Sequence, residues 1–99
     1  MYTQAQVLQF LDSQKEFLRN NYRIVKLGLF GSYAKGTQTP ESDVDILLEF
    51  EDGTENLLDK RLSLEQFFQS QLGLKVDIAR ERFLRPGIRE KILSHVIFV

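Results

Sequence analysis

Near the N-terminus, apolar residues recur with the spacing of a helix. The pattern predicts a helix over residues 3–19, and its apolar stripe comprises Val7, Leu11 and Leu18. Thr3 and Gln6 have the spacing of a capping box, in which each side chain accepts a hydrogen bond from the backbone N–H of the other residue. The sequence therefore predicts an opening helix that carries its own cap and buries one face.

Two stretches of alternating polarity predict strands. The first covers residues 23–30, and its apolar face comprises Val25, Leu27 and Leu29. The second covers residues 43–50, and its apolar face comprises Val44, Ile46, Leu48 and Phe50. Between them, Gly31-Ser32 breaks the first strand, a short turn of helix can follow, and residues 37–42 form a loop.

The second half of the chain predicts a helix, a strand and another helix. A helix capped by Thr54 ends at Gly73, which suits a left-handed helix terminus, and its apolar side comprises Leu58, Leu62, Phe68 and Leu72. Residues 74–79 alternate as a third strand. Pro86 suits the first turn of a last helix that carries Ile88, Ile92 and Leu93. The apolar tail, residues 96–99, either packs on the sheet as a short strand or meets a partner.

This order of elements, α-β-(α)-β-α-β-α, predicts an α+β fold in which helices flank a small mixed sheet. The 99 residues have room for one domain, residues 1–99, and 42% apolar with 27% charged residues is typical of a soluble globular protein. No apolar run approaches the ~18 residues of a membrane span, and the N-terminus lacks a signal-peptide pattern. We therefore expect a cytoplasmic protein that does not contact a membrane.

Residue usage and charge exclude several classes of function. The chain has no cysteine, which rules out a disulfide scaffold, a Cys-ligated zinc site, an iron–sulfur cluster and a thiol nucleophile. Its one histidine, His95, argues against a multi-histidine metal site or a Ser-His-Asp triad, and we interpret it as a surface or helix-end residue. The net charge of −1 is unlike that of a general nucleic-acid binder, so no direct nucleic-acid contact is expected.

The charges are unevenly distributed along the chain. Residues 41–59 hold eight Asp or Glu and no Lys or Arg, whereas residues 80–91 hold five basic residues against two acidic ones. The acidic block is either solvated surface or a cation site. The basic block is either a solvated helix face or a surface that meets phosphates or an acidic partner. Composition alone leaves both alternatives open.

Carboxylates occupy the polar positions of two predicted strands. Asp43 and Asp45 lie two residues apart, so their side chains share a face, with Cα atoms roughly 6.5–7 Å apart. Asp77 points away from the apolar face of the third strand. If these strands are neighbours, the three carboxylates converge and repel, and Mg²⁺ is the simplest relief because it takes a few carboxylates together with waters and substrate phosphates. A solvated sheet face is the alternative for Asp43 and Asp45 taken alone, although Asp is disfavoured in strands.

The turn at Gly31-Ser32 has features that suit phosphate. A strand-to-helix turn presents free backbone N–H groups and a positive dipole end, Gly31 removes the Cβ that would hold a phosphate away, and Ser32 adds a hydroxyl donor. Most Gly-Ser pairs are simply turns, and this one fits neither a Walker A loop nor a dinucleotide fingerprint.

The turn and the carboxylates together are far more specific. Gly31-Ser32, followed after ten residues by Asp43-Val44-Asp45, resembles the signature of the DNA polymerase β-like nucleotidyltransferase superfamily. Lys75-Val-Asp-Ile resembles its third-carboxylate strand, and the resemblance covers residues 23–99. The short chain and residues 82–93 are similar to the minimal nucleotidyltransferase (MNT) group. Lys35 stands where relatives often carry Arg, which keeps the charge but loses the bidentate fork.

The resemblance implies the fold of that superfamily and transfer of a nucleoside monophosphate from an NTP to a hydroxyl, with release of pyrophosphate. By this analogy Gly31 and Ser32 hold the triphosphate of ATP. Asp43 and Asp45 hold two Mg²⁺ ions, which can clamp the attacking and leaving oxygens. Asp77 completes the metal site and helps to deprotonate the acceptor hydroxyl. Tyr33 either lines the nucleotide site or has a structural role.

MNT proteins are often encoded beside a HEPN-domain protein, and the resemblance therefore implies a partner. In such pairs the HEPN protein is an RNase toxin, and the MNT antitoxin silences it by transferring AMP from ATP to a toxin tyrosine. Our leading hypothesis is such a protein adenylyltransferase antitoxin. A non-catalytic antitoxin that acts by contact alone and a transferase for a small-molecule hydroxyl are the alternatives. The complete set of Ser32, Asp43, Asp45 and Asp77 favours the enzyme, and the small size argues against a second substrate pocket.

Overall fold

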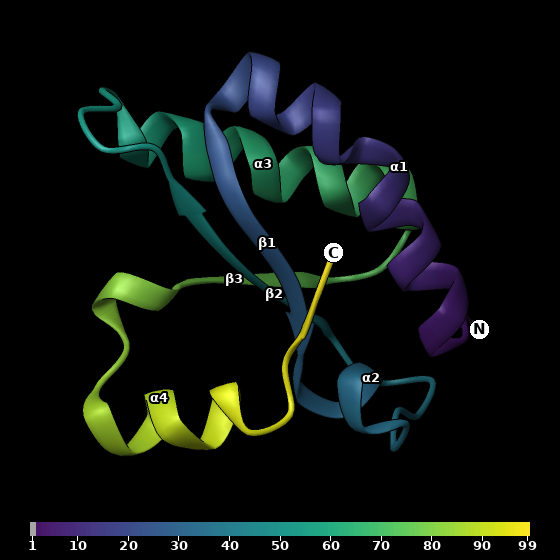
Figure 1. Cartoon of the computed structure of the whole chain (residues 1–99). Coiled ribbons are helices and arrows are strands. Elements are labelled where there is room, and N and C mark those ends of the chain that lie inside the picture. Colours follow the sequence, from purple (N-terminus) through teal and green to yellow (C-terminus); the bar gives the residue numbers. More distant parts are fainter. Residues whose placement is uncertain (1) are drawn as a thin grey trace.

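The computed structural model describes residues 2–99 and shows a four-stranded mixed sheet with helices on both faces (Figure 1). The helices are α1 (Gln4–Tyr22), α2 (Gly31–Lys35), α3 (Leu57–Leu72) and α4 (Pro86–Leu93), with a single 3₁₀ turn, η1 (Glu81–Phe83), before α4. The strands are β1 (Ile24–Phe30), β2 (Val44–Phe50), β3 (Val76–Arg80) and β4 (Ile97–Phe98). The expected α+β class and order of elements are confirmed. None of the helices in this part of the chain has the length and hydropathy to cross a membrane.

The strands lie in the order β3-β2-β1-β4. β1 is antiparallel to both of its neighbours, β2 and β4, whereas β2 and β3 are parallel and are joined through α3. Parallel neighbours need such a crossover, because the chain must return to the end of the sheet where the first strand began before it can run in the same direction again. β2 is therefore paired on both sides and is the most enclosed strand of the sheet.

The main core lies between the sheet and the helices α1 and α3. The predicted inward face of β2 is confirmed, because all four of its apolar residues are buried: Val44, Ile46, Leu48 and Phe50. The predicted stripe of α1 is also confirmed, and α3 contributes Leu64, Phe68 and Leu72. Each fully buried aliphatic or aromatic side chain contributes about 1.5–3 kcal/mol, so this face supplies most of the stabilising burial.

The start of α1 has the predicted capping box. The Thr3 hydroxyl accepts from the backbone N–H of Gln6 at 3.1 Å, and the Gln6 side chain accepts from the backbone N–H of Thr3 at 2.8 Å. At its other end the helix runs beyond the predicted residue 19 to Tyr22, and Arg23 ends it in the left-handed conformation with φ 58°. Within the last turn the side chain of Asn21 donates to the carbonyl of Phe17 at 2.9 Å.

The predicted inward face of β1 is wrong at Val25. The pairing of β1 with β2 contains a bulge between Ile24 and Lys26, and Val25 lies 55% exposed. Ile24 takes the buried position, followed by Leu27 and Leu29. One extra residue in a bulge shifts the alternation on one side of it, and a simple period of two cannot anticipate this shift.

The predicted apolar side of α3 is only half right. Phe68 and Leu72 are buried, but Leu58 is 71% exposed and Leu62 is also exposed, while Leu64 is buried. Leu62 lies two residues before Leu64, about 200° around the helix, so the two residues cannot face the sheet together. The helix also starts at Leu57 rather than after a Thr54 cap.

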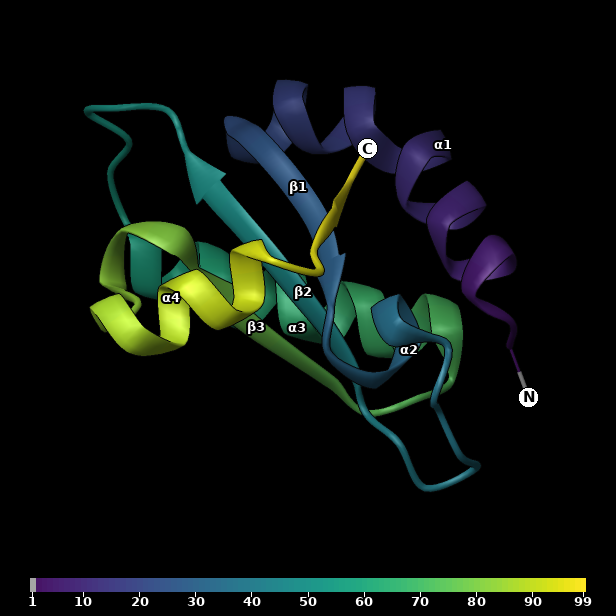
Figure 2. The same cartoon turned by 60° about the horizontal axis from the view of Figure 1, so that its bottom comes forward.

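On the opposite face of the sheet, α4 and the C-terminal tail form a second cover (Figure 2). Leu47 points to this side of β2 and is fully buried, and Ile92 is the one buried residue of α4. The other two predicted core positions of this helix, Ile88 and Leu93, are exposed. The tail packs on the sheet. Its Phe98 side chain lies so close to Gly28 of β1 that a Cβ added to this glycine would be only 2.9 Å from Phe98 Cδ1.

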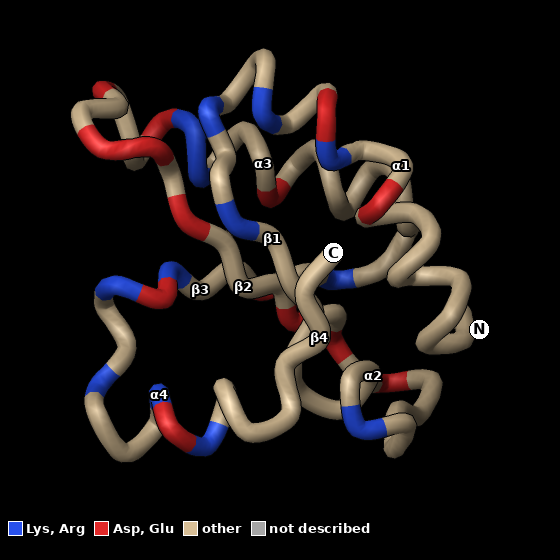
Figure 3. The backbone as a smooth tube through the Cα atoms, viewed as in Figure 1, with Lys and Arg blue, Asp and Glu red and all other residues tan. Residues whose placement is uncertain are grey.

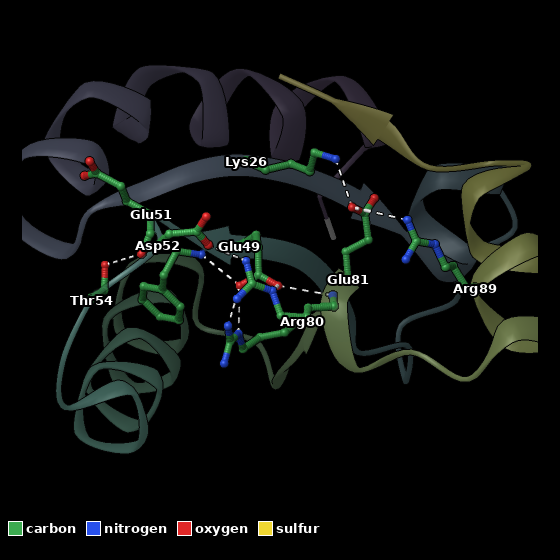
Figure 4. Close-up of polar contacts among 10 residues, drawn as sticks. Lys26, Glu49, Glu51, Asp52, Thr54, Arg80, Glu81 and Arg89 are labelled. Carbon is green, nitrogen blue, oxygen red and sulfur yellow. Dashed lines mark hydrogen bonds and ion pairs between the residues drawn. The ribbon is translucent and has the colours of Figure 1, made fainter.

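A buried carboxylate fixes the chain between the sheet and α4 (Figure 4). The Glu49 side chain accepts two hydrogen bonds from the Arg80 guanidinium, at 2.6 and 2.9 Å. It also accepts the backbone N–H groups of Phe50 and Arg82, at 3.0 and 3.1 Å. Arg80 lies over the Phe83 ring, 4.6 Å from its centroid, so the guanidinium is held by charge and by stacking.

A second acidic residue extends this network to the neighbouring elements. Glu81, in η1, contacts Lys26 of β1 at 2.9 Å and Arg89 of α4 at 3.9 Å. β1 is thereby joined to η1 and α4 on one side of the sheet, although Lys26 and Glu81 lie 55 residues apart in the sequence (Figure 4). The network sets where α4 begins and so limits where its C-terminal end can lie.

We expect Glu49→Ala to destabilise the protein by about 3–5 kcal/mol, because it leaves the guanidinium of Arg80 buried without its partner. Asp52→Ala is the matched control. Asp52 pairs with Arg82 at 2.6 Å, but its side chain is 86% exposed and the pair is screened by solvent, so the loss should be much smaller than that of Glu49→Ala. Urea denaturation at pH 7 measures both values, and equal losses in the two variants would contradict the assignment.

Stability in acid provides a second test of the same pair. Burial raises the pKa of Glu49, but hydrogen bonds from Arg80 and from the backbone of Phe50 and Arg82 outweigh it and lower the pKa below its ordinary value of 4.5. A pKa that is lower in the folded than in the unfolded protein stabilises the folded state at pH values above the unfolded pKa. This stabilisation is lost as the pH falls through the folded pKa. The stability difference between wild type and Glu49→Ala should therefore shrink progressively as the pH falls below 4.5.

Candidate active site

The parallel pairing of β2 and β3 brings two of the predicted site residues together. Asp45 and Asp77 are direct partners in the register, so their Cα atoms lie about 4.8 Å apart. Both point to the face of the sheet that α1 and α3 leave free, because Ile46 and Ile78, their apolar neighbours, are buried on the other face. Asp43 immediately precedes β2. Figure 3 shows acidic positions of the sheet close to α2.

The carboxylate of Asp45 lies in surroundings that are electrostatically unfavourable for a negative charge. Burial, followed by the nearby carboxylates of Asp77 and Asp43, raises the pKa of Asp45 from 3.8 to about 6. All three causes disfavour the charged form. The three predicted ligands therefore share one electrostatic environment, in which the central residue is the most affected.

The turn at Gly31 lies directly against this carboxylate. Gly31 has φ +72°, a conformation that side chains with a Cβ rarely adopt. A Cβ at this position would overlap Asp45 Oδ2 and would lie 2.9 Å from Asp45 Cγ. Glycine is thus required twice, once for the backbone conformation and once for the space that the carboxylate occupies. The structure joins the predicted phosphate turn and the predicted metal ligands into one site.

The remaining residues of α2 divide between core and surface. Ser32 is half-buried in the first turn of this helix, beside Gly31. Tyr33 is 1% exposed and belongs to the main core, so its role is structural. Lys35 is exposed in the last turn, which Gly36 ends with φ 73°.

Two residues hold α2 from distant parts of the chain. The backbone N–H of Gly31 donates to His95 Nε2 at 3.0 Å. At the other end of α2, the side chain of Gln4 donates to the carbonyls of Tyr33 and Ala34, at 3.1 and 2.7 Å. Sequence reasoning missed both contacts, although it described His95 as a surface or helix-end residue and the structure places it just beyond the end of α4. The feature of the sequence that could have pointed to His95 is that the single histidine stands directly before the apolar tail. Nothing in the sequence marked Gln4 as a contact of α2.

The carboxylates suit a hard divalent cation. In the part of the chain that the structure describes, no group of three or more acidic or histidine side chains is placed to hold a metal ion on its own. Mg²⁺ does not require such a group, because it binds through one or two carboxylates and keeps waters and substrate phosphates as its other ligands. Burial, followed by the neighbouring carboxylates of Asp77 and Asp43, raises the pKa of Asp45, and a bound cation would relieve the repulsion. The donor set therefore fits Mg²⁺, and Asp43, Asp45 and Asp77 stay the predicted ligands.

A glycine-serine turn at the start of a short helix, set against carboxylates on adjacent parallel strands, is the arrangement of a nucleotidyltransferase. The chain belongs to the family of the nucleotidyltransferase domain, whose family model matches residues 11–99. The family resemblance seen in the sequence is thereby confirmed.

Relatives match this chain along its whole length. Protein adenylyltransferase MntA of Thermococcus cleftensis is 36% identical over 99 residues, which cover 100% of this chain and 98% of that protein. A Methanocaldococcus jannaschii protein named as a candidate protein adenylyltransferase is 34% identical over 100 residues and covers both chains fully.

Solved structures share the fold. One described as a candidate minimal nucleotidyltransferase superposes with a TM-score of 0.80 at 29% identity and covers 97% of this chain and 95% of that one. A toxin–antitoxin complex with AMP-PNP contains a chain that matches with a TM-score of 0.70 at 28% identity. That match covers 88% of this chain and 69% of the other.

We expect Asp45→Asn to stabilise the metal-free protein at pH 8 and to leave it unchanged near pH 4. The pKa of the Asp45 carboxyl is raised to about 6 in the folded protein, so this group is neutral in acid. As the pH rises through that value the carboxyl becomes charged, and the folded state loses stability. Asparagine is neutral at both pH values and removes the repulsion. Thermal melts with and without Mg²⁺ measure the effect, and Mg²⁺ should stabilise the wild type more than the variant. A variant that melts below the wild type at pH 8 would contradict this account.

We expect Gly31→Ala to abolish nucleotide transfer, because the added Cβ displaces the carboxylate of Asp45. Gly36→Ala is a matched control, since Gly36 has almost the same positive φ of +73° and nothing lies within 4 Å of its Cβ position. Both variants should lose about 1–2 kcal/mol of stability from the left-handed backbone. Transfer assays at a temperature where both are folded should show activity only in the Gly36 variant. Equal activity in the two would show that the space at Gly31 is unimportant.

Proposed function

We propose that this protein is a Mg²⁺-dependent protein adenylyltransferase that transfers AMP from ATP to a hydroxyl of a HEPN-type RNase toxin, and that it thereby acts as an antitoxin. The observation that carries this proposal is the position of Asp45, which lies in register with Asp77 and in contact with Gly31. This one residue joins the cation site to the nucleotide turn. The acceptor is a tyrosine in our proposal, and the reaction takes place in the cytoplasm.

The relatives support the choice of nucleotide and acceptor. The Thermococcus cleftensis protein, which matches over the full length, is named a protein adenylyltransferase. The chain in the toxin–antitoxin complex with AMP-PNP shares this fold at 28% identity, so an ATP analogue accompanies that pair. We infer the same nucleotide and the same kind of partner for this chain.

The residues of the site have distinct roles in this proposal. The first turn of α2 receives the triphosphate, because the first N–H groups of a helix have no acceptor within the helix and the Ser32 hydroxyl adds a donor. Asp43, Asp45 and Asp77 would hold Mg²⁺, which would supply positive charge to stabilise the phosphates during transfer. Lys35 is exposed one turn further along α2, where its charge attracts the nucleotide.

The proposed chemical step is an in-line displacement at the α-phosphorus of ATP. The tyrosine oxygen attacks the α-phosphorus, the bond between this phosphorus and the oxygen that bridges to the β-phosphorus breaks, and pyrophosphate leaves. Asp77, the exposed carboxylate of the pair, accepts the proton of the tyrosine hydroxyl. The products are a phosphodiester on the tyrosine and free pyrophosphate. The protein contributes mainly position and electrostatic stabilisation, as is usual for phosphoryl transfer.

We expect the toxin partner to gain about 329 Da, or multiples of this mass, when it is mixed with this protein, ATP and Mg²⁺, because AMP is added and pyrophosphate leaves. Intact-mass spectrometry measures the product. The double variant Asp43→Asn, Asp45→Asn should add no mass, since it cannot hold the cation. Asp59→Asn is a matched control, because it removes an acidic charge from α3 and leaves the site unchanged.

The same double variant separates catalysis from binding alone. If AMP transfer is the antitoxin mechanism, cells that express the toxin should survive with wild type and with Asp59→Asn but not with the double variant. Full protection by a double variant that adds no mass would show that contact is sufficient. The proposed enzyme mechanism would then be replaced by the non-catalytic alternative.

A further inference from the structure

We propose that His95 is a positioning residue for the nucleotide turn, and that it fixes the peptide of Gly31 so that the following N–H groups point toward the triphosphate. This inference rests on the proposed function, because it assigns a role within the nucleotide site. His95 lies just beyond α4, 64 residues from the turn that it contacts. It is also the single histidine of the chain, so its ring can be observed without ambiguity.

The two contacts of the ring define its tautomer. The backbone N–H of Gly31 can only donate, so Nε2, 3.0 Å away, must accept and carries no proton. Nδ1 lies 2.9 Å from the carbonyl oxygen of Lys91, which can only accept, so Nδ1 carries the proton and donates it. The ring is therefore the neutral Nδ1–H form, and both of its nitrogens are used.

The contact replaces a cap that α2 lacks. The N-cap residue of this helix is Phe30, whose side chain makes no capping hydrogen bond. The first N–H groups of a helix need an acceptor from outside the helix, and His95 Nε2 supplies one to Gly31. Because this first donor is already satisfied, the N–H groups that follow it in the turn are the ones left for an anion.

The same contact also affects the carboxylate side of the site. Gly31 lies so close to Asp45 that a single Cβ would overlap the carboxylate, so a rotation of the Gly31 peptide changes the space around Asp45. Gln4 holds the carbonyl end of α2, but it lies at the opposite end of the helix and does not fix the first peptide. His95 is the residue that links the turn to α4.

The test compares three substitutions at two neighbouring positions. His95→Phe keeps a ring of similar size and removes the acceptor. His95→Gln keeps an acceptor at nearly the position of Nε2. Ser94→Ala is the matched control, because the Ser94 hydroxyl donates to the same Lys91 carbonyl at 2.6 Å without contacting Gly31.

We expect His95→Phe to raise the KM for ATP and the Kd for MgATP about tenfold, the effect of one lost hydrogen bond, with kcat changed much less. His95→Gln should restore both values to within about threefold of wild type, and Ser94→Ala should match wild type. All measurements are made at least about 15 °C below the melting temperature of each variant, so that a loss of stability alone does not alter them.

Nuclear magnetic resonance of the imidazole nitrogens gives a readout that is independent of activity. The wild type should show a neutral ring with the proton on Nδ1, and Nε2 should couple to the amide of Gly31. A proton on Nε2 would overturn the inference. So would an unchanged affinity for MgATP in His95→Phe. If the wild type binds MgATP but transfers no AMP, the proposed function fails while the positioning role in nucleotide binding stands. If it binds no nucleotide, both fail.

Discussion

The parallel register of β2 with β3 is the constraint on which the site depends. It makes Asp45 and Asp77 direct neighbours, and it does so because the apolar residues that alternate with them fill the core on the other face. A slip of one residue in either strand would bury a carboxylate and expose an isoleucine. Hydrophobic burial therefore determines the separation of the charged groups, and the core and the site cannot vary independently.

The rest of the site is built around that pair by segments from the two ends of the chain. Gly31 fits against Asp45 only because it has no side chain, His95 holds the Gly31 peptide, and Gln4 holds the far end of α2. The Glu49 and Arg80 pair fixes the segment that leads into α4 and so constrains where His95 lies. A chain of 99 residues thus uses residues from α1 to the C-terminal tail to support one five-residue helix.

The sequence predicted the parts that depend on local pattern. The capping box of α1 and the alternation of β2 follow from neighbours along the chain, and each is a short-range rule. The link between the carboxylates and the glycine-serine turn was predicted from the family resemblance, because these residues lie in separate segments. The errors concern longer-range packing. The bulge at Val25 is set by pairing with β2, and the exposure of Leu62 follows from the burial of Leu64, which lies about 200° around α3. The role of His95 depends on a contact across 64 residues, which periodicity does not detect.

Two carboxylates of β2 illustrate the difference between a charge that stabilises the fold and a charge that belongs to the candidate site. Glu49 and Asp45 lie four residues apart on the same face of one strand. Glu49 is surrounded by donors, and its pKa is lowered, whereas Asp45 is half-buried among other carboxylates, and its pKa is raised to about 6. Relief of this repulsion by a neutral residue would stabilise the metal-free fold. A contact surface gains nothing from a half-buried carboxylate held against other carboxylates, but a site that must bind a cation together with ATP does. The cost in stability at Asp45 therefore favours catalysis over binding alone.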